Sequence, residues 1–263
     1  MKTLKRILML ILLCAILAVG YVAWILLGFS ISNPHNYKRV GDIPTPYGYE
    51  RVDGNDPSFC HYLRSLPLKP RGSDVMLYTG DKARFQSLNY AVVDMPVISN
   101  AEQCADVCMR LRAEYLFNTG QYRNIHFKDV NGHPLHYSGG SSRKALETYL
   151  KKVYVVASTH SLSRSLPRRS LKDMQPGDVF VYAAVDRPGH HKYGHAVIVV
   201  DVAESKSGKK AFLLAEGNTP ARNIHVMRNL ENPFRSPWFF VDGDEEMLLL
   251  AVFPYKSNEL HHF

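Results

Sequence analysis

Residues 194–216 read GHAVIVVDVAESKSGKKAFLLAE, and this stretch is the clearest guide to the class of fold. Residues 196–202 and 211–215 are near-continuous apolar runs, and the polar turn between them, residues 205–209, contains a glycine. Apolar runs of this length around a glycine-containing turn are typical of a β-hairpin that is buried on both faces. We therefore expect an antiparallel hairpin, with His195 at the start of its first strand.

The most convincing helix precedes this hairpin in the chain. Cys104, Cys108, Leu111 and Tyr115 recur at helical spacing, and Asn100 is a plausible N-cap for the helix that carries them. Cys104 is then expected in the first turn of that helix.

Further helices and strands complete an α+β pattern, with helices early and an antiparallel sheet late. The expected helices cover residues 59–66 and 142–155, with helix or turn continuing to 166, and the expected further strands cover residues 75–78, 90–93 and 179–183.

The N-terminus predicts a membrane anchor. Lys2, Lys5 and Arg6 are followed by residues 7–31, which contain no charged side chain. A stretch of about 20 apolar residues is long enough to cross a bilayer, whereas the apolar core of a cleavable signal peptide has about 7–15. Because basic residues stay on the cytoplasmic side, a single-pass inner-membrane protein with a periplasmic or other extracytoplasmic C-terminal part is expected. The alternative is cleavage after Gly20.

The expected organisation is a signal anchor at residues 1–31, a proline-rich linker at 32–57 and one globular extracytoplasmic domain at 58–263. The formal net charge is +8, and the anchor's basic flank accounts for three of these charges. The remaining Lys and Arg are scattered, without a basic stripe interleaved with aromatics, which argues against a nucleic-acid partner. The expected partners are the membrane, through residues 7–31, and peptidoglycan or other envelope peptides.

Cys104 and His195 match the requirements of thiol chemistry. The amides and dipole of a helix N-terminus favour a thiolate and can hold an oxyanion, and an imidazole can exchange the proton. The order of elements is a cysteine on a helix, Pro-Gly-Asp before a strand, and Gly-His opening another strand. This order resembles that of the papain-like cell-wall peptidases and amidases of the NlpC type. The resemblance implies a cysteine-bearing helix packed on an antiparallel sheet that carries histidine.

A closer resemblance covers almost the whole domain. The chain resembles the bacterial domain of unknown function 4846 family, which implies a cell-envelope domain and no particular activity. The segments that carry this resemblance are residues 63–69, 103–106, 110–116, 177–180, 194–201 and 213–215.

A histidine base needs a partner on its second ring nitrogen. Folding the hairpin brings residues 216–220 opposite His195, so Glu216 is the first candidate and Asn218 the second. Asp201 is less favoured, because it lies at the far end of the histidine's own strand.

Metal and disulfide chemistry are weaker interpretations. His190, His191 and His195 form a histidine cluster, but no carboxylate follows at ligand spacing, so no metal or other cofactor is expected. Cys104 and Cys108 are poorly placed to bridge each other, and a bridge between Cys60 and Cys108 stays open.

Two functions remain. The first is a cysteine hydrolase or amidase acting on peptidoglycan-like peptide or amide bonds, and the alternative is a non-catalytic envelope binding or structural domain. Arg110, Arg112 and Glu114 are expected to form a solvated helix face, with a substrate-binding role for Arg112 as the alternative.

Overall fold

The predicted hairpin forms the centre of an antiparallel sheet. Strand β6 (His195–Ser205) pairs with β7 (Lys210–Glu216), with Ile198 opposite Ala215. The structure, a computed structural model, describes residues 2–27, 31–187, 193–232, 234 and 236–263.

Eight strands make up the main sheet. Its order is β12-β5-β6-β7-β8-β2, while β1 also pairs with β6 and β9 with β7, and all of these pairings are antiparallel. The bounds of the other six strands are β1 (Tyr49–Arg51), β2 (Asn89–Val92), β5 (Val179–Tyr182), β8 (His225–Met227), β9 (Phe239–Val241) and β12 (Leu260–His261).

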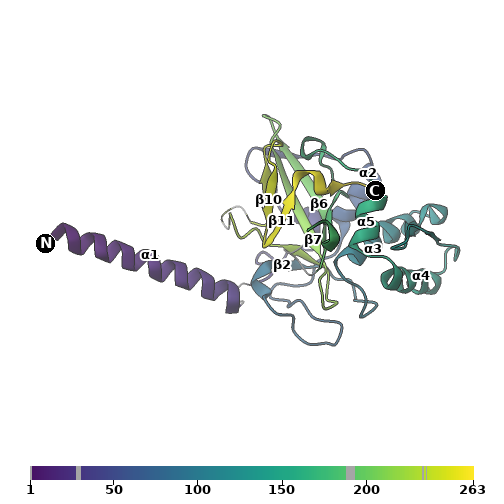
Figure 1. Ribbon diagram of the computed structural model, residues 1–263, viewed down its shortest axis with the longest axis horizontal. Helices are drawn as coiled ribbons and strands as arrows, with labels where there is room; N and C mark the ends of the chain where they lie inside the picture. Colours follow the sequence, from purple (N-terminus) through teal and green to yellow (C-terminus); the bar gives the residue numbers. More distant parts are fainter. Residues whose placement is uncertain (1, 28–30, 188–192, 233, 235) are drawn as a thin grey trace.

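Both faces of this sheet are covered, which explains why β6 is apolar at successive positions instead of alternating. Ala196 and Ile198 belong to the core that the helices share, whereas Val197 and Val199 belong to a second core beneath β9 and a separate two-stranded hairpin. That hairpin consists of β10 (Met247–Leu250) and β11 (Phe253–Lys256). The fold is therefore α+β, with the sheet as its middle layer (Figure 1).

Within the described residues, four helices accompany the sheet: α2 (Pro57–Ser65), α3 (Cys104–Asn118), α4 (Arg143–Val156) and α5 (Thr159–Ser165). The Asp56 carboxylate caps α2 by accepting the Phe59 N–H at 3.1 Å, and the Ser142 hydroxyl caps α4 by accepting the Ala145 N–H at 3.3 Å. Such caps satisfy amides that the first helical turn leaves without intrahelical partners.

The remaining elements are short. They are the hairpin strands β3 (His126–Lys128) and β4 (Pro134–His136) and the 3-10 turns η1 (Val40–Asp42), η2 (Gln86–Leu88), η3 (Tyr122–Asn124), η4 (Leu171–Asp173), η5 (Ala184–Asp186) and η6 (Ser257–Glu259).

Helix α1 (Lys2–Leu27) projects from the domain (Figure 1). Its segment Thr3–Ala23 has a mean hydropathy of 2.5, and that segment is not buried by the rest of the chain. The helix is long and apolar enough to cross a membrane.

Residues 32–57 differ from the expected linker, because they pack as part of the domain. Val40 and Ile43 are buried in the helix-side core, and β1 extends the main sheet by pairing with β6. The four prolines in this segment suggest an extended chain, but apolar residues between them fill the space beside α2 and β6.

The face of α3 that carries Arg110 and Glu114 also differs from expectation, because it is buried instead of solvated. Arg110 donates to the Glu102 carboxylate at 2.6 Å, and Glu114 accepts from Arg143 of α4. Helix α4 covers this face, so its charges are paired inside the protein. Residues 75–78, expected as a strand, make only isolated bridges.

Candidate functional site

Cys104 is the first residue of α3, closer to the helix end than expected. The residue before the helix is Gln103, whereas the predicted cap, Asn100, lies in the preceding turn. Asp106 fixes this start, since its carboxylate accepts the Gln103 N–H at 2.8 Å. The thiol therefore lies where the helix dipole and the unpaired first-turn amides favour negative charge.

His195 and Glu216 meet at one end of the main sheet. His195 opens β6 and Glu216 closes β7, so the hairpin places them on adjacent strands. The His195 Nε2–H donates to Glu216 Oε2 at 2.7 Å, and both side chains are buried. Of the two orienting candidates, Glu216 is the one that contacts the imidazole in this way.

A second imidazole holds the other oxygen of the same carboxylate. His225, on β8, lies with its Nε2 3.2 Å from Glu216 Oε1. Its Nδ1 is 3.2 Å from the carbonyl oxygen of Asn223. His225 is not predicted from the sequence, because a three-residue strand offers no alternation from which its orientation can be inferred.

The Cys104 sulfur and the His195 imidazole line the same cavity, and the sulfur is near enough to raise the pKa of His195. Because Nε2 of that ring is taken by Glu216, Nδ1 is the nitrogen left for the thiol. The structure thus joins Cys104, His195, Glu216 and His225 in one chain of contacts from three strands and a helix. Cys104 retains 7% of its exposure, which is enough to reach a cavity.

The charges in this chain of contacts support one another. Burial alone lowers the pKa of His195, but the Cys104 sulfur and the Glu216 carboxylate outweigh it and raise that pKa to about 10. Burial alone raises the pKa of Glu216, but the bonds from His195 and His225 hold it well below its usual range. These contacts favour the protonated form of His195 and the ionised form of Glu216.

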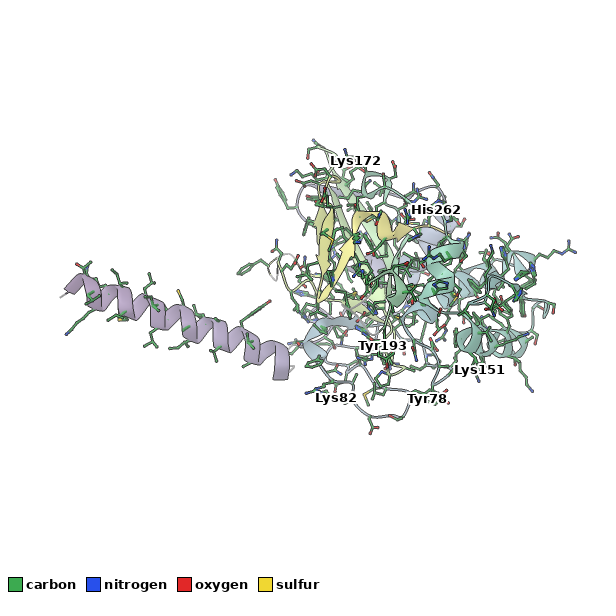
Figure 2. The ribbon with its side chains drawn as sticks, in the orientation of Figure 1. Tyr78, Lys82, Lys151, Lys172, Tyr193 and His262 are labelled. Carbon is green, nitrogen blue, oxygen red and sulfur yellow. The ribbon has the colours of Figure 1, made fainter. Side chains whose placement is uncertain are left out.

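Cys104 and His195 open onto the same cavity, of about 280 Å³. Its other lining residues are Tyr182, Tyr193, Gly194, Asn218, Thr219 and Phe253. Tyr193 is labelled in Figure 2. Phe253 stacks on the His195 ring, with centroids 3.8 Å apart and planes 26° apart. A flat aromatic cover limits water at the imidazole and is favourable to a positively charged ring.

Most of the chain, including the residues of this site, matches the model of a known protein family. The family model described as domain of unknown function (4846) matches residues 40–141 and 138–262. The chain belongs to this family. No curated protein and no solved structure matches it.

Asn218 lines the cavity of this family member without taking the place of Glu216. Its side-chain oxygen accepts the Thr219 N–H at 2.8 Å, and the Thr219 hydroxyl donates to Gln103 Oε1 at 3.0 Å. The loop after β7 is thus tied to the residue before Cys104. Asp201 lies elsewhere, buried and bound by Arg51 and Arg64 at 2.7 Å each.

Two glycines allow the site to assemble. A Cβ at Gly217 would lie 2.6 Å from Val107 Cγ2 of α3, and a Cβ at Gly194 would lie 2.5 Å from the Tyr182 carbonyl oxygen. Side chains at these positions would push the end of β7 away from α3 and the start of β6 away from β5. Both glycines adjoin residues of the contact chain, Glu216 and His195.

All four cysteines are free, so the Cys60–Cys108 bridge left open by the sequence does not form here. Burial raises the pKa of Cys60 to about 12 and that of Cys108 well above its usual value. Both thiols are therefore held neutral.

His190 and His191 of the histidine cluster lie outside the described residues. Within the described part of the chain, no group of three or more potential ligands gathers. Arg112, the alternative substrate-binding residue, pairs with Asp56 at 3.0 Å.

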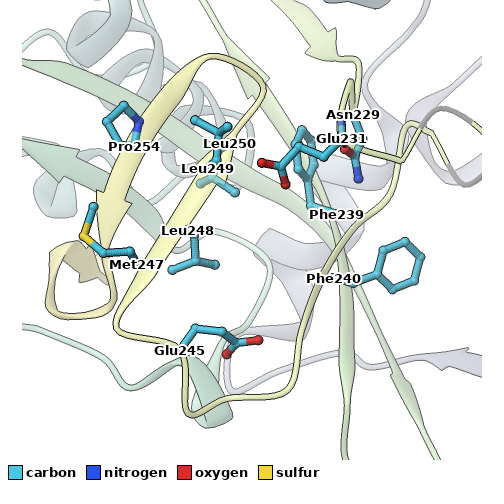
Figure 3. A pocket seen from close by; sticks show the side chains of 10 residues that line it. All are labelled: Asn229, Glu231, Phe239, Phe240, Glu245, Met247, Leu248, Leu249, Leu250 and Pro254. Carbon is cyan, nitrogen blue, oxygen red and sulfur yellow. Dashed lines mark hydrogen bonds between the residues drawn. The ribbon is translucent and has the colours of Figure 1, made fainter. Parts of the chain in front are cut away.

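A larger cavity of about 540 Å³ lies between β9 and the β10–β11 hairpin (Figure 3). Figure 3 shows Glu231 and Glu245 among its mainly apolar lining. Its lining residues include no thiol or imidazole, so the smaller cavity is the better candidate for chemistry.

Proposed function

We propose that this protein is a membrane-anchored cysteine hydrolase or amidase that acts on peptide or amide bonds of the cell envelope. The observation that carries the proposal is the contact chain Cys104–His195–Glu216 at a cavity, with the sulfur at a helix N-terminus. A nucleophile, a base and an orienting group in this relation are the parts of a papain-like site.

In the first step His195 accepts the proton of the Cys104 thiol while the sulfur attacks the carbonyl carbon of the scissile amide, and a carbon–sulfur bond forms. The first-turn amides of α3 are the available donors for the oxyanion. The carbon–nitrogen bond then breaks as the His195 imidazolium gives its proton to the leaving amine. Glu216 keeps the ring oriented throughout.

In the second step water attacks the thioester. His195 accepts a proton from that water, the carbon–sulfur bond breaks, and the carboxylic acid product leaves. His195 then returns this proton to the Cys104 sulfur, which restores the starting state. The Phe253 ring over His195 supports this cycle, because it shields the imidazolium from bulk water.

The proposed location is the inner membrane, with the domain in the periplasm or another extracytoplasmic space. Lys2, Lys5 and Arg6 precede the apolar helix, and this distribution favours a cytoplasmic N-terminus. Envelope peptides such as those of peptidoglycan are then the amides within reach of the domain.

The test is release of new peptides or amines from peptidoglycan fragments by the full-length protein, measured by mass spectrometry. Cys104→Ser and His195→Ala should each abolish release while the thermal midpoint moves by only a few degrees. Cys60→Ser is the matched control, because Cys60 is a buried thiol remote from the cavity, and it should retain activity. Large destabilisation by Cys104→Ser, with no release by the wild type, would favour the non-catalytic envelope domain.

A further inference from the structure

We infer that the domain rests on the bilayer through an aromatic surface beside α1, formed by Tyr47, Phe85 and Phe234. The partner is the boundary between lipid headgroups and hydrocarbon in the membrane that α1 spans. This inference rests on the proposed membrane anchorage and adds a second, non-covalent attachment to it.

The first argument is that α1 touches the domain before the helix ends. The Tyr21 hydroxyl donates to the Leu230 carbonyl oxygen at 2.6 Å, and η2 lies against α1. Tyr21 is near the end of the membrane-length segment Thr3–Ala23. If that segment fills the hydrocarbon, the domain surface at Leu230 lies at the membrane surface. Figure 1 shows the end of α1 meeting the domain beside β2.

The second argument is the gathering of exposed aromatics at this place. Phe234, four residues after Leu230, and Tyr47 are both fully exposed. Both line one cavity of about 360 Å³, which also includes Tyr90 of β2. Phe85 is exposed and directly precedes η2, the turn that lies against α1. Isolated apolar residues on a surface are ordinary, but fully exposed aromatics grouped at one place indicate an interaction site.

The third argument is the chemistry of this surface. The cavity shared by Tyr47 and Phe234 is lined mainly by aromatic and proline side chains, together with Ile43 and Ser236, and by no Asp, Glu, Lys or Arg. Arg228 lies beside it, with its guanidinium 5.4 Å from the Tyr90 ring centroid, and the Arg84 guanidinium lies 4.9 Å from the Phe85 ring centroid. Aromatic rings with flanking cations suit the interfacial region, where apolar surface and lipid phosphate lie side by side.

This attachment has a consequence for the candidate site. An anchor alone leaves a domain free to tilt, whereas a second contact fixes its orientation to the membrane. The cavity at Cys104 is then held at a constant height above the lipid, which suits substrates presented close to the membrane.

The test uses the full-length protein in proteoliposomes, with one nitroxide label at Phe234→Cys. The background is Cys14→Ser with Cys104→Ser, because the remaining thiols, Cys60 and Cys108, are fully buried. The matched control is Val155→Cys on α4, an exposed apolar position on the side of the domain away from α1 (Figure 1). Accessibility to oxygen and to a water-soluble nickel complex is measured by electron paramagnetic resonance.

The expected ratio of oxygen to nickel accessibility is several-fold higher at position 234 than at position 155. Equal ratios at the two positions, in protein that stays in the vesicles through alkaline wash, would overturn the aromatic surface while leaving the anchor intact. Release of the protein by alkaline wash would overturn both the anchor and the surface.

Discussion

Glu216→Gln isolates the electrostatic role of the buried carboxylate. Glutamine has nearly the same shape and can still accept the His195 Nε2–H, so the ring keeps its place while the negative charge is lost. The N–O distance of 2.7 Å puts the two charge centres about 4 Å apart, which corresponds to about 4 kcal/mol at an effective dielectric constant of about 20.

Because one pH unit corresponds to about 1.4 kcal/mol, the substitution should lower the pKa of His195 by up to about 3. The wild-type pKa of His195 is about 10, so in the variant the ring should lose its proton close to neutral pH. The assay is NMR titration of ¹⁵N-histidine-labelled protein, with the His195 signals assigned from a His195→Gln variant.

The matched control is Glu204→Gln, which removes a carboxylate near the far end of β6, the strand that begins with His195. Glu204 pairs with Lys210 at 2.5 Å, and its loss should leave the His195 titration unchanged. If Glu216→Gln also leaves that titration unchanged, Glu216 does not stabilise the imidazolium and the reasoning about the site fails.

Three further predictions follow from neighbouring residues. His225→Gln should lower the pKa of His195 less than Glu216→Gln does in the same titration, because the Glu216 carboxylate remains. Loss of the His225 contact raises the pKa of Glu216 itself. A larger effect on His195 than that of Glu216→Gln would contradict this order. Burial raises the pKa of Asp106 to about 7, so the folded state binds more protons than the unfolded state between about pH 4 and pH 7, and stability falls as pH rises through this window. Asp106→Asn should remove that fall, which amounts to about 3 kcal/mol between pH 5 and pH 8, in urea unfolding at these two pH values, and an unchanged pH dependence would show that the carboxyl is not held protonated. Gly217→Ala should reduce the free energy of unfolding by about 1–3 kcal/mol, because its Cβ would lie 2.6 Å from Val107 Cγ2, and an alanine variant as stable as wild type would show that β7 and α3 are less closely packed.

Local sequence pattern was sufficient for the hairpin, for α3 and α4, and for the proximity of His195 and Glu216. His195 opens one strand of a tight hairpin and Glu216 closes the other, so their meeting follows from the turn alone. The position of Cys104 near the start of a helix required only the helical spacing of the residues that follow it. Because each of these inferences uses neighbours along the chain, periodicity carries enough information to make them.

The rest depends on contacts between distant segments. Phe253 reaches His195 from the β10–β11 hairpin, and His225 comes from a three-residue strand, so neither has a periodic signal. Arg110 and Glu114 look solvated in the sequence, because nothing nearby indicates that α4 covers them. The start of α3 is set by the bond between Asp106 and the Gln103 amide, which competes with the plausible cap at Asn100.

The most direct test of the central claim is the reactivity of Cys104 in the folded, full-length protein. Treatment with iodoacetamide at neutral pH, followed by peptide mass spectrometry, measures the modification of each cysteine separately. The account predicts that Cys104 is alkylated while Cys60 and Cys108 are protected, since Cys104 alone among these three lines the cavity beside His195 and the other two are fully buried. Modification of Cys104 only after denaturation would contradict the account, because the sulfur would then be a packing group of the core.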